Sequence, residues 1–471
     1  MRIIGREEEQ AALKEYVESD KPEFVAVYGR RRVGKTFLIR EFFLNKFTFH
    51  ITGLANTEMQ IQLRNFNAAL QKYGKISFPI VTNWFDAFEQ LIHLLENTSQ
   101  KTKKVIFFDE LPWMDTHRSG FITALEHFWN GWASSKPDIL LIACGSSTSW
   151  MINNLIKNHG GLHNRITRRM LIEPFTLEEC EAYYKYNKIV MTRHQIVEGY
   201  MALGGIPYYL SLMKKGASLS QNIDALCFAQ NGTLKDEFSI LFSSLFKHSE
   251  NHVKVVESLG RKAKGMTREE IIKTSRLPDG GGLSKTLDEL EQCGFIRRYR
   301  SYGKKNKLQI YQLIDFYTLF YLNFIKGNNF DDENFWTNFI DNARHRAWSG
   351  YAFEQVCRAH IRQIKNKLGI AGVLTYTASW RSQKSEPGAQ IDLLIDRNDQ
   401  VINLCEIKYS NAEFVIDKRY DEVLRNKKNA FAQESNTKKA VHLTMITTYG
   451  VRRNEFSGSM QSEIKMDDLF N

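Results

Sequence analysis

A run of eight residues near the start of the chain has the spacing of a phosphate-binding loop. The run is Gly29, Arg30, Arg31, Arg32, Val33, Gly34, Lys35 and Thr36, and it fits G-x-x-x-x-G-K-[ST]. In such a loop the glycines let backbone N–H groups converge on phosphate oxygens, and the start of the next helix adds partial positive charge. Lys35 can reach the β and γ phosphates, and Thr36 can hold Mg²⁺. The spacing therefore predicts a site for a nucleoside triphosphate such as ATP, together with Mg²⁺.

Two acids follow the apolar run Val105–Phe108, at the point where a buried parallel strand would end. Ligands of open α/β sheets bind at that edge. We expect Asp109 to join the Mg²⁺ shell and Glu110 to orient or deprotonate the attacking water. The pair indicates hydrolysis of the triphosphate rather than binding alone. The alternative is two surface acids that cap a strand.

A third apolar run, Ile139–Cys144, ends in a turn of small hydroxyl residues. Ser146 or Ser147 could contact the γ-phosphate there, although a polar turn after a strand is also ordinary loop chemistry.

Three arginines precede the strand-like run Met170–Pro174. Arg165, Arg168 and Arg169 are candidates for an arginine finger, which neutralises charge in the transition state and can come from a neighbouring subunit. Of these three arginines, Arg165 is the one that we count among the predicted nucleotide-binding residues. The alternative is a basic face that meets solvent or DNA.

A second set of chemically capable residues lies in the last third of the chain. Two strand candidates, Gln390–Ile395 and Val401–Lys408, are joined by a polar segment and predict a hairpin. A connection centred on Asp399 would set Asp392 opposite Glu406, and like charges so placed are costly unless a cation lies between them. With Lys408 to position water or stabilise developing charge, the set predicts a Mg²⁺ or Mn²⁺ site suited to phosphodiester hydrolysis.

These residues must be positioned by strands and helices, and several of those elements carry a family resemblance. The phosphate loop, Ile4–Glu8, Phe107–Glu110, Pro174–Thr176 and Gly204–Pro207 together resemble the archaeal-type AAA+ ATPases, relatives of origin-recognition and STAND ATPases. The resemblance covers about the first half of the chain. It implies an ATPase core over residues 1–185 and a helical lid over residues 186–248.

Residues 249–325 have the pattern of short helices followed by a hairpin, which is typical of a winged helix. Thr267 and Glu270 form a capping box, and leucines at 283, 287 and 290 give the next helix its apolar stripe. Two strand candidates follow, around a glycine-containing basic turn. The cations of this hairpin predict contact with a nucleic-acid backbone, with a protein-contact role as the alternative. They are Arg297, Arg298, Arg300, Lys304, Lys305 and Lys307.

The spacing D-x13-E-x-K from Asp392 to Lys408 resembles the PD-(D/E)XK nuclease superfamily, including the C-terminal domain often fused to archaeal-type ATPases. The helical segment Trp348–Arg358 is similar to the first helix of that fold, and the resemblance implies Glu354 as a further metal ligand. Ile391 departs from the pattern, because proline usually precedes the aspartate. The resemblance spans about residues 335–448 and implies a nuclease-like domain over 326–471. The alternatives are ion pairs of Glu354 with Arg358 and of Glu406 with Lys408.

The predicted class is therefore α/β: a P-loop parallel sheet with a helical lid, a winged helix and a restriction-endonuclease-like C-terminal domain. With 471 residues, three or four compact units are expected. No apolar run is long enough to span a membrane, and the acidic start of the chain favours the cytoplasm. The six cysteines lack C-x-x-C spacing, which favours reduced thiols. The net charge of +11 favours a polyanionic partner, although a basic surface is often only a solubility device. The winged-helix pattern favours DNA as this partner, and a homo-oligomer would suit an arginine finger.

Two functions fit this pattern. The first is an ATPase that engages nucleic acid and carries a Mg²⁺-dependent nuclease site. The second is a STAND-like ATP-dependent switch that binds DNA or a protein partner, with a nuclease-like domain that does not cleave.

Overall fold

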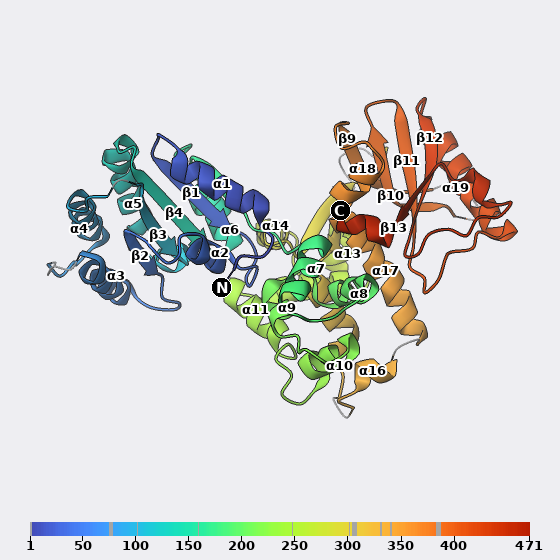
Figure 1. Cartoon of the computed structure of the whole chain (residues 1–471), viewed down its shortest axis with the longest axis horizontal. Helices are drawn as coiled ribbons and strands as arrows, with labels where there is room; N and C mark the ends of the chain where they lie inside the picture. The colour runs from blue at the N-terminus through green and yellow to red at the C-terminus, as the bar shows by residue number, and fades with distance from the viewer. Residues whose placement is uncertain are drawn as a thin grey trace. The chain divides into compact units, whose positions relative to one another are not determined.

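The computed structural model divides the chain into two compact units, Met1–Pro174 and Phe175–Asn471 (Figure 1). Each unit is described by itself. The structure describes residues 2–74, 79–100, 102–158, 160–246, 248–300, 302–303, 309–329, 332–339, 342–382 and 388–471.

The first unit is built on a five-stranded sheet in the order β2-β3-β4-β1-β5, and every neighbouring pair is parallel. Its strands are β1 (Glu23–Tyr28), β2 (Phe49–Thr52), β3 (Lys104–Asp109), β4 (Ile139–Gly145) and β5 (Arg168–Leu171). Its helices are α1 (Glu7–Glu18), α2 (Lys35–Phe42), α3 (Met59–Gly74), α4 (Trp84–Glu96), α5 (Phe121–Gly131) and α6 (Thr148–Trp150), with short turns at Leu111–Trp113, Ala133–Ser135 and Met151–Ile156. The predicted α/β class and parallel sheet are confirmed.

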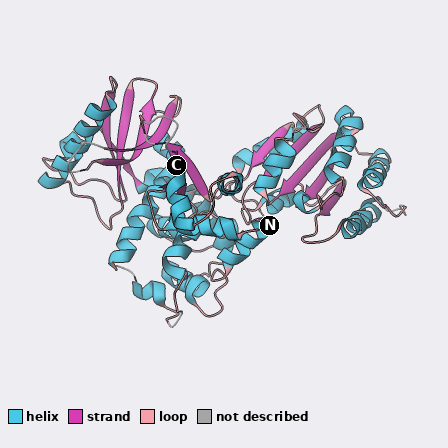
Figure 2. Ribbon diagram, turned by 180° about the vertical axis from the view of Figure 1, so that it is seen from behind, coloured by secondary structure: helices cyan, strands magenta, loops and turns pink. Residues whose placement is uncertain are grey.

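Helices lie on both faces of this sheet (Figure 1, Figure 2). Phe24 and Ala26 of β1 belong to one apolar cluster with residues of α3, α4 and α5. Val25 and Val27 are also fully buried, and strand periodicity turns them to the opposite face. Burial on both faces explains why the strand sequences are continuous apolar runs rather than alternating ones.

Because the strands are parallel, their carboxyl ends share one edge. Tyr28 of β1 is level with Gly145 of β4, and Thr52 of β2 is level with Asp109 of β3. The residues that directly follow these strands therefore gather at that edge, where the phosphate loop begins.

The second unit begins with helices and continues into a small antiparallel sheet in the order β6-β8-β7. The first helices are α7 (Leu177–Tyr186), α8 (Arg193–Leu203), α9 (Pro207–Ser211), α10 (Leu219–Ile223), a turn at Asp224–Phe228, and α11 (Glu237–Leu245). There follow α12 (Glu250–Gly260), β6 (Met266–Thr267), α13 (Arg268–Ser275), α14 (Gly281–Gln292), β7 (Ile296–Arg300), β8 (Gln309–Leu313), α15 (Phe316–Phe320) and a turn at Tyr321–Ile325.

The local signals in this part are confirmed. Thr267 and Glu270 form the reciprocal capping box at the start of α13. Leu283, Leu287 and Leu290 are the buried leucines of α14. The two predicted strands pair as a hairpin, whereas Lys304, Lys305 and Lys307 lie outside the described residues.

The chain ends in a five-stranded mixed sheet in the order β13-β12-β11-β10-β9. Its elements are α16 (Phe335–Phe339), α17 (Ala343–Ala359), α18 (Ile361–Lys367), β9 (Thr375–Arg381), β10 (Gln390–Arg397), β11 (Val401–Lys408), α19 (Lys418–Ser435), β12 (Ala440–Thr447), β13 (Ser462–Lys465), and turns at Ser457–Ser459 and Met466–Phe470. β9, β10 and β11 pair antiparallel, and β11, β12 and β13 pair parallel. The predicted β10–β11 hairpin is confirmed, with Leu393 opposite Cys405.

Three contacts within the second unit join its first helices to elements of the carboxyl-terminal part. The Leu177 N–H donates to His360 Nε2 over 3.0 Å. The Tyr409 hydroxyl, directly after β11, lies 3.1 Å from Glu198 Oε1 and 2.9 Å from His194 Nε2 on α8. Burial lowers the pKa of His360 to about 4, so the ring is neutral and its Nε2 is free to accept.

All six cysteines are buried and none forms a disulfide bond, as their spacing predicts. Within the described ranges, no helix is both long and apolar enough to cross a bilayer.

Candidate functional site

Both glycines of the phosphate loop have conformations that a side chain would oppose. Gly29 has a φ of +140°, and a Cβ at this position would lie 2.3 Å from the Ile172 carbonyl oxygen. Gly34 has a φ of +90° at the start of α2. The close approach at Gly29 and the left-handed turn at Gly34 explain why the loop needs glycine at both ends.

The Lys35 side chain is buried beneath the loop. Its ammonium donates to the carbonyl oxygens of Gly29 and Arg30, each over 2.8 Å. The cation is therefore held among backbone groups of the loop itself, at the start of α2.

Thr36 and Asp109 meet at the carboxyl edge of the sheet, as the sequence predicts. The Thr36 hydroxyl donates to Asp109 Oδ1 over 2.9 Å, and an Arg40 guanidinium nitrogen lies 3.8 Å from Asp109 Oδ2. Burial raises the pKa of Asp109, although the Thr36 hydrogen bond opposes this rise. A buried carboxylate beside a hydroxyl provides oxygen ligands of the kind that Mg²⁺ prefers.

Glu110 is fixed by the end of the neighbouring strand. Its Oε2 accepts from the Ser146 N–H over 3.1 Å and from the Ser146 hydroxyl over 2.8 Å. The Glu110 backbone is left-handed, with a φ of 48°, and this turns the residue out of the β3 direction. The structure thus brings Lys35, Thr36, Asp109, Glu110 and Ser146 to one edge of the sheet.

Arg165 is not among the residues at this edge. The strand β5 pairs with β1 so that Arg168 is level with Val25, and the Thr167 N–H bonds to the Phe24 carbonyl. Arg165 therefore lies beyond the amino-terminal end of β5, at the sheet edge opposite the phosphate loop. The strand β5 runs from Arg165 toward the loop, so the structure does not bring Arg165 to the phosphate loop of its own chain, and its role as an arginine finger stays a prediction.

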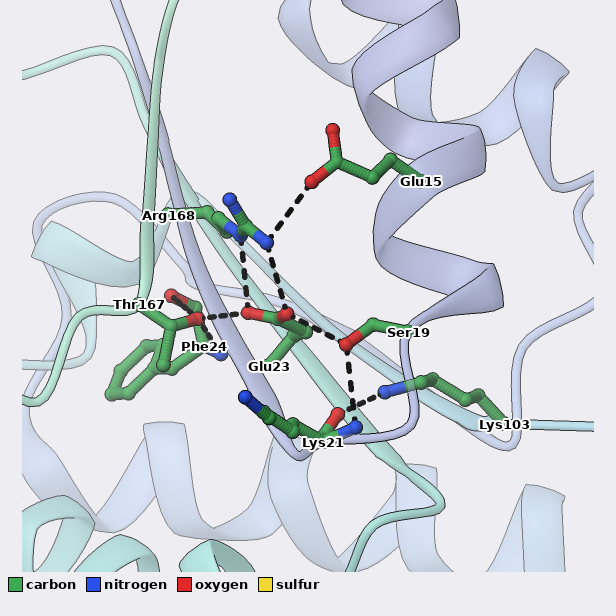
Figure 3. Close-up of polar contacts among 8 residues, drawn as sticks. All are labelled: Glu15, Ser19, Lys21, Glu23, Phe24, Lys103, Thr167 and Arg168. Atoms are coloured by element: carbon green, nitrogen blue, oxygen red, sulfur yellow. Dashed lines mark hydrogen bonds and ion pairs between the residues drawn. The ribbon is translucent and has the colours of Figure 1, made fainter.

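Arg168 has structural partners at that opposite edge (Figure 3). Its guanidinium lies 3.4 Å from the Glu23 carboxylate and 3.0 Å from Glu15 on α1, and it covers the Tyr16 ring. Burial alone would raise the pKa of Glu23, but hydrogen bonds from Thr167, Ser19 and Arg168 together hold it below its usual value.

The second set of predicted residues lines one cavity of about 740 Å³ in the second unit. Glu354 comes from α17, Asp392 from β10, and Glu406 and Lys408 from β11. The register of the hairpin, continued by one residue from Leu393 and Cys405, sets Asp392 opposite Glu406. The predicted convergence of the two strands and the helix at one place is thus observed.

The Glu406 carboxylate is occupied by partners from α19. Lys427 donates to Oε2 over 2.7 Å and Tyr420 to Oε1 over 2.6 Å, while the Lys408 ammonium lies 3.3 Å away. Burial alone would raise the pKa of Glu406, but the two lysines and the tyrosine hold it below its usual value. Lys427 and Tyr420 were not predicted as partners of Glu406, because the sequence of α19 does not indicate which strand this helix packs against.

The expected metal ligands are not gathered as a metal site. Among the residues that the structure describes, no group of three His, Cys, Asp or Glu side chains could hold a metal ion. Glu406 is turned to α19, Asp392 accepts from the Gln390 amide, and burial together with the Asp392 charge raises the pKa of Glu354 to about 8. The three predicted carboxylates therefore share a cavity but have different surroundings, and their role as metal ligands stays a prediction.

Two arginines of the basic hairpin have partners within the chain. Arg298 bonds to Glu291 and lies 2.7 Å from Asp288, both on α14. Arg297 donates to Gln312 over 3.0 Å, and burial lowers its pKa to about 9. These two cations brace the hairpin rather than extend from it.

The parallel sheet, the glycine loop after its first strand and the Thr36–Asp109 contact define a P-loop nucleotide-binding domain. Residues 3–213, which make up less than half of the chain, match a family described as "ATPase domain predominantly from Archaea". A family of ATPases implies a nucleotide and, as a rule, Mg²⁺.

Known proteins resemble the chain over most of its length. An uncharacterized protein of Methanocaldococcus jannaschii, MJECL04, is 23% identical over 413 residues, which is 87% of this chain and 88% of that protein. The Walker-type ATPase PABY2304 of Pyrococcus abyssi is 20% identical, covers 68% of this chain and 96% of its own, and has a TM-score of 0.49. The ORC2 protein of Aeropyrum pernix is 12% identical, with coverages of 69% and 94% and a TM-score of 0.41. The STAND protein PH0952 of Pyrococcus horikoshii is 16% identical, with coverages of 79% and 52% and a TM-score of 0.31.

Proposed function

We propose that the chain binds and hydrolyses ATP at the phosphate-loop edge of the first unit. The observation that carries this proposal is the 2.9 Å contact of the Thr36 hydroxyl with the buried Asp109 carboxylate, directly beside a glycine loop. Thr36 and Asp109 would hold Mg²⁺, which would offset the negative charge of the phosphates. Lys35 exchanges its loop carbonyls for β and γ phosphate oxygens.

Glu110 is the proposed general base. Its carboxylate is held by Ser146 at the end of β4, and β4 is the neighbour of the strand β1 that leads into the loop. Glu110 accepts the proton of the attacking water or orients that water toward the γ-phosphate. The Ser146 hydroxyl donates a hydrogen bond to this carboxylate in the structure, and Ser146 is also the candidate to contact the γ-phosphate. Arg165, placed at the far edge, would act as a finger only on a neighbouring copy of the chain.

Two substitutions test this assignment. Lys35→Ala removes the only lysine of the loop and is expected to abolish ATP binding in calorimetry. Glu110→Gln keeps the shape of the side chain but removes the base, so ATP is expected to bind and to remain uncleaved. Undiminished turnover in either variant would refute the assigned roles.

For the second unit we propose a helical lid over residues 186–248, a winged helix over 249–325 and a nuclease-like domain over 326–471. The succession of α12, β6, α13, α14, β7 and β8 supports the winged helix, because two helices before a hairpin are the usual form of this module. The net charge of +11 supports engagement of nucleic acid, with DNA favoured.

The proposed activity of the C-terminal domain is hydrolysis of phosphodiesters with Mg²⁺ or Mn²⁺. The support is the shared cavity of Glu354, Asp392, Glu406 and Lys408. In this scheme the carboxylates hold the cation, which would supply Lewis-acid stabilisation. Lys427 must then leave Glu406, and Lys408 positions water or meets the developing charge.

A second candidate function is an ATP-dependent switch with a C-terminal domain that does not cleave. The observation in its favour is that Lys427, Lys408 and Tyr420 already satisfy the Glu406 carboxylate without a metal ion. The two candidates are separated by incubating labelled DNA and RNA with the full chain, Mg²⁺ or Mn²⁺, and ATP.

Cleavage that is lost in Asp392→Ala and Lys408→Ala would support the nuclease. Cleavage that persists in both variants would show that the assigned site is wrong. If no substrate is cut while ATP hydrolysis proceeds, the switch is favoured.

A further inference from the structure

We propose that the cavity beside Asp392 receives a single strand of nucleic acid through a cationic rim supplied largely by the proposed winged helix and α17. This inference deepens the proposed nuclease function and rests on it. The rim consists of four exposed cations that line the cavity: Lys262 and Lys264 in the turn between α12 and β6, Arg346 on α17, and Arg381 at the end of β9.

The charge of the cavity changes from its rim to its interior. Among the described lining residues, seven side chains are cationic and four are carboxylates. The four rim cations are exposed, whereas Glu406 is buried and Glu354 and Asp392 are partly buried. Glu270 pairs with Lys262 at the rim, whereas the other three carboxylates lie deeper, where a phosphodiester would be cut. A polyanion therefore meets a rim in which the cations outnumber the carboxylate. An acidic peptide contains no phosphodiester, so these inner carboxylates would have no role in binding it.

The size of the cavity favours one strand over two. A volume of about 740 Å³ is in the range of a pocket for a drug-sized ligand, so it admits a short stretch of one strand and not an intact double helix. The ring of Tyr299 also contributes to the wall. A positively charged groove combined with aromatic side chains is how proteins hold single strands without reading their sequence.

The rim is connected to the inner carboxylates by hydrogen bonds. The Lys264 ammonium bonds to the amide oxygen of Gln390, and the Gln390 amide nitrogen bonds to Asp392. The Tyr299 hydroxyl donates to the Lys264 carbonyl over 2.6 Å and fixes this turn. A phosphate held at Lys264 is thus one side chain away from Asp392, although Lys264 and Asp392 are far apart in the sequence.

Binding to the full chain tests the proposal independently of cleavage. Fluorescence anisotropy would compare a labelled single-stranded DNA, the same sequence as RNA, and the blunt DNA duplex, with Ca²⁺ in place of Mg²⁺. We expect the single strands to bind at least tenfold more tightly than the duplex, and the DNA and RNA measurements show which strand is preferred. Equal or tighter binding of the duplex would overturn the inference.

The rim is tested by the double variant Lys262→Glu/Lys264→Glu. Its matched control is Lys214→Glu/Lys215→Glu, which makes the same charge change at exposed lysines that do not line the cavity. We expect the rim variant to lose at least tenfold in single-strand affinity, with a shallower salt dependence, and the control to lose less than twofold. Because Lys262 pairs with Glu270, Arg381→Gln provides a second and milder rim variant with a smaller expected loss. Equal losses in rim and control variants would overturn the inference.

The outcome for the rim and the outcome for catalysis are distinguishable. Asp392→Ala should keep its single-strand affinity even if it cannot cleave. Rim-dependent binding of single strands without any cleavage would support the inference and refute the nuclease. Cleavage at Asp392 that is indifferent to strandedness and to the rim would refute the inference and leave the nuclease intact.

Discussion

The Ser146 hydroxyl provides a direct test of the proposed ATP hydrolysis by the first unit. Ser146→Ala removes the 2.8 Å hydrogen bond to Glu110 Oε2 and leaves the 3.1 Å bond from the backbone N–H. A hydrogen bond to a charged group is worth about 1.5–3 kcal/mol, and 1.4 kcal/mol corresponds to about tenfold in rate. If this bond is what orients the base, single-turnover hydrolysis should fall by roughly tenfold to a hundredfold.

The assay is rapid-quench hydrolysis of labelled ATP with enzyme in excess, together with calorimetric measurement of ATP affinity. Affinity should fall less than the rate, because the loop and Lys35 supply most of the proposed phosphate contacts. Ser147→Ala is the matched control, since Ser147 is the adjacent residue and its side chain does not cap the helix that follows. Hydrolysis that is unchanged or faster in Ser146→Ala, with unchanged affinity, would refute the idea that Ser146 orients a catalytic Glu110.

Three further outcomes follow from the geometry. Arg168→Ala should lower the stability of the first unit by about 1–3 kcal/mol, because the buried Glu23 carboxylate is left with fewer partners. ATP turnover per folded molecule should not change. A loss of turnover without a loss of stability would instead favour Arg168 as an arginine finger. Because the pKa of His360 is about 4 in the folded chain against 6.5 for an ordinary histidine, the unfolded chain binds the extra proton first, and acidification from about pH 7.5 to 5 should cost roughly 2 kcal/mol. Hydrogen exchange in α17 and α18 measures this loss, which should shrink in His360→Gln. Gly29→Ala should abolish ATP binding, because its Cβ would lie 2.3 Å from a neighbouring carbonyl oxygen, and calorimetry would detect any affinity that remained.

The chemistry at the sheet edge could be predicted because its signals are local. A glycine loop directly after one strand and two acids directly after another need only a parallel sheet to bring them together, and continuous apolar runs indicate that sheet. The hairpin that carries Asp392 and Glu406 could also be predicted, because its turn is short and the register of its strands follows from the turn.

Long-range geometry could not be predicted from the sequence. Arg165 stands before a strand whose direction and pairing decide which sheet edge it occupies, and its own sequence does not contain that information. Lys427 and Tyr420 approach Glu406 from a helix that begins well after the strand. Arg297 and Arg298 have the composition of a phosphate-binding surface, yet partners on a neighbouring strand and helix hold them. Composition gives the charge of a segment and not its intramolecular partners.

The contacts of Leu177 with His360 and of Tyr409 with Glu198 limit how this protein can be divided into shorter fragments. Helix α8 packs against α15 and α17, so the stretch matched by the ATPase family ends inside a structure that the carboxyl half completes. A protein shortened after residue 213 would leave the Leu177 N–H without its acceptor and the apolar side of α8 uncovered. Inactivity of such a fragment would report lost packing and would say nothing about communication between the two proposed sites. Single-residue changes in the full-length chain are therefore the appropriate means of assigning each half its task.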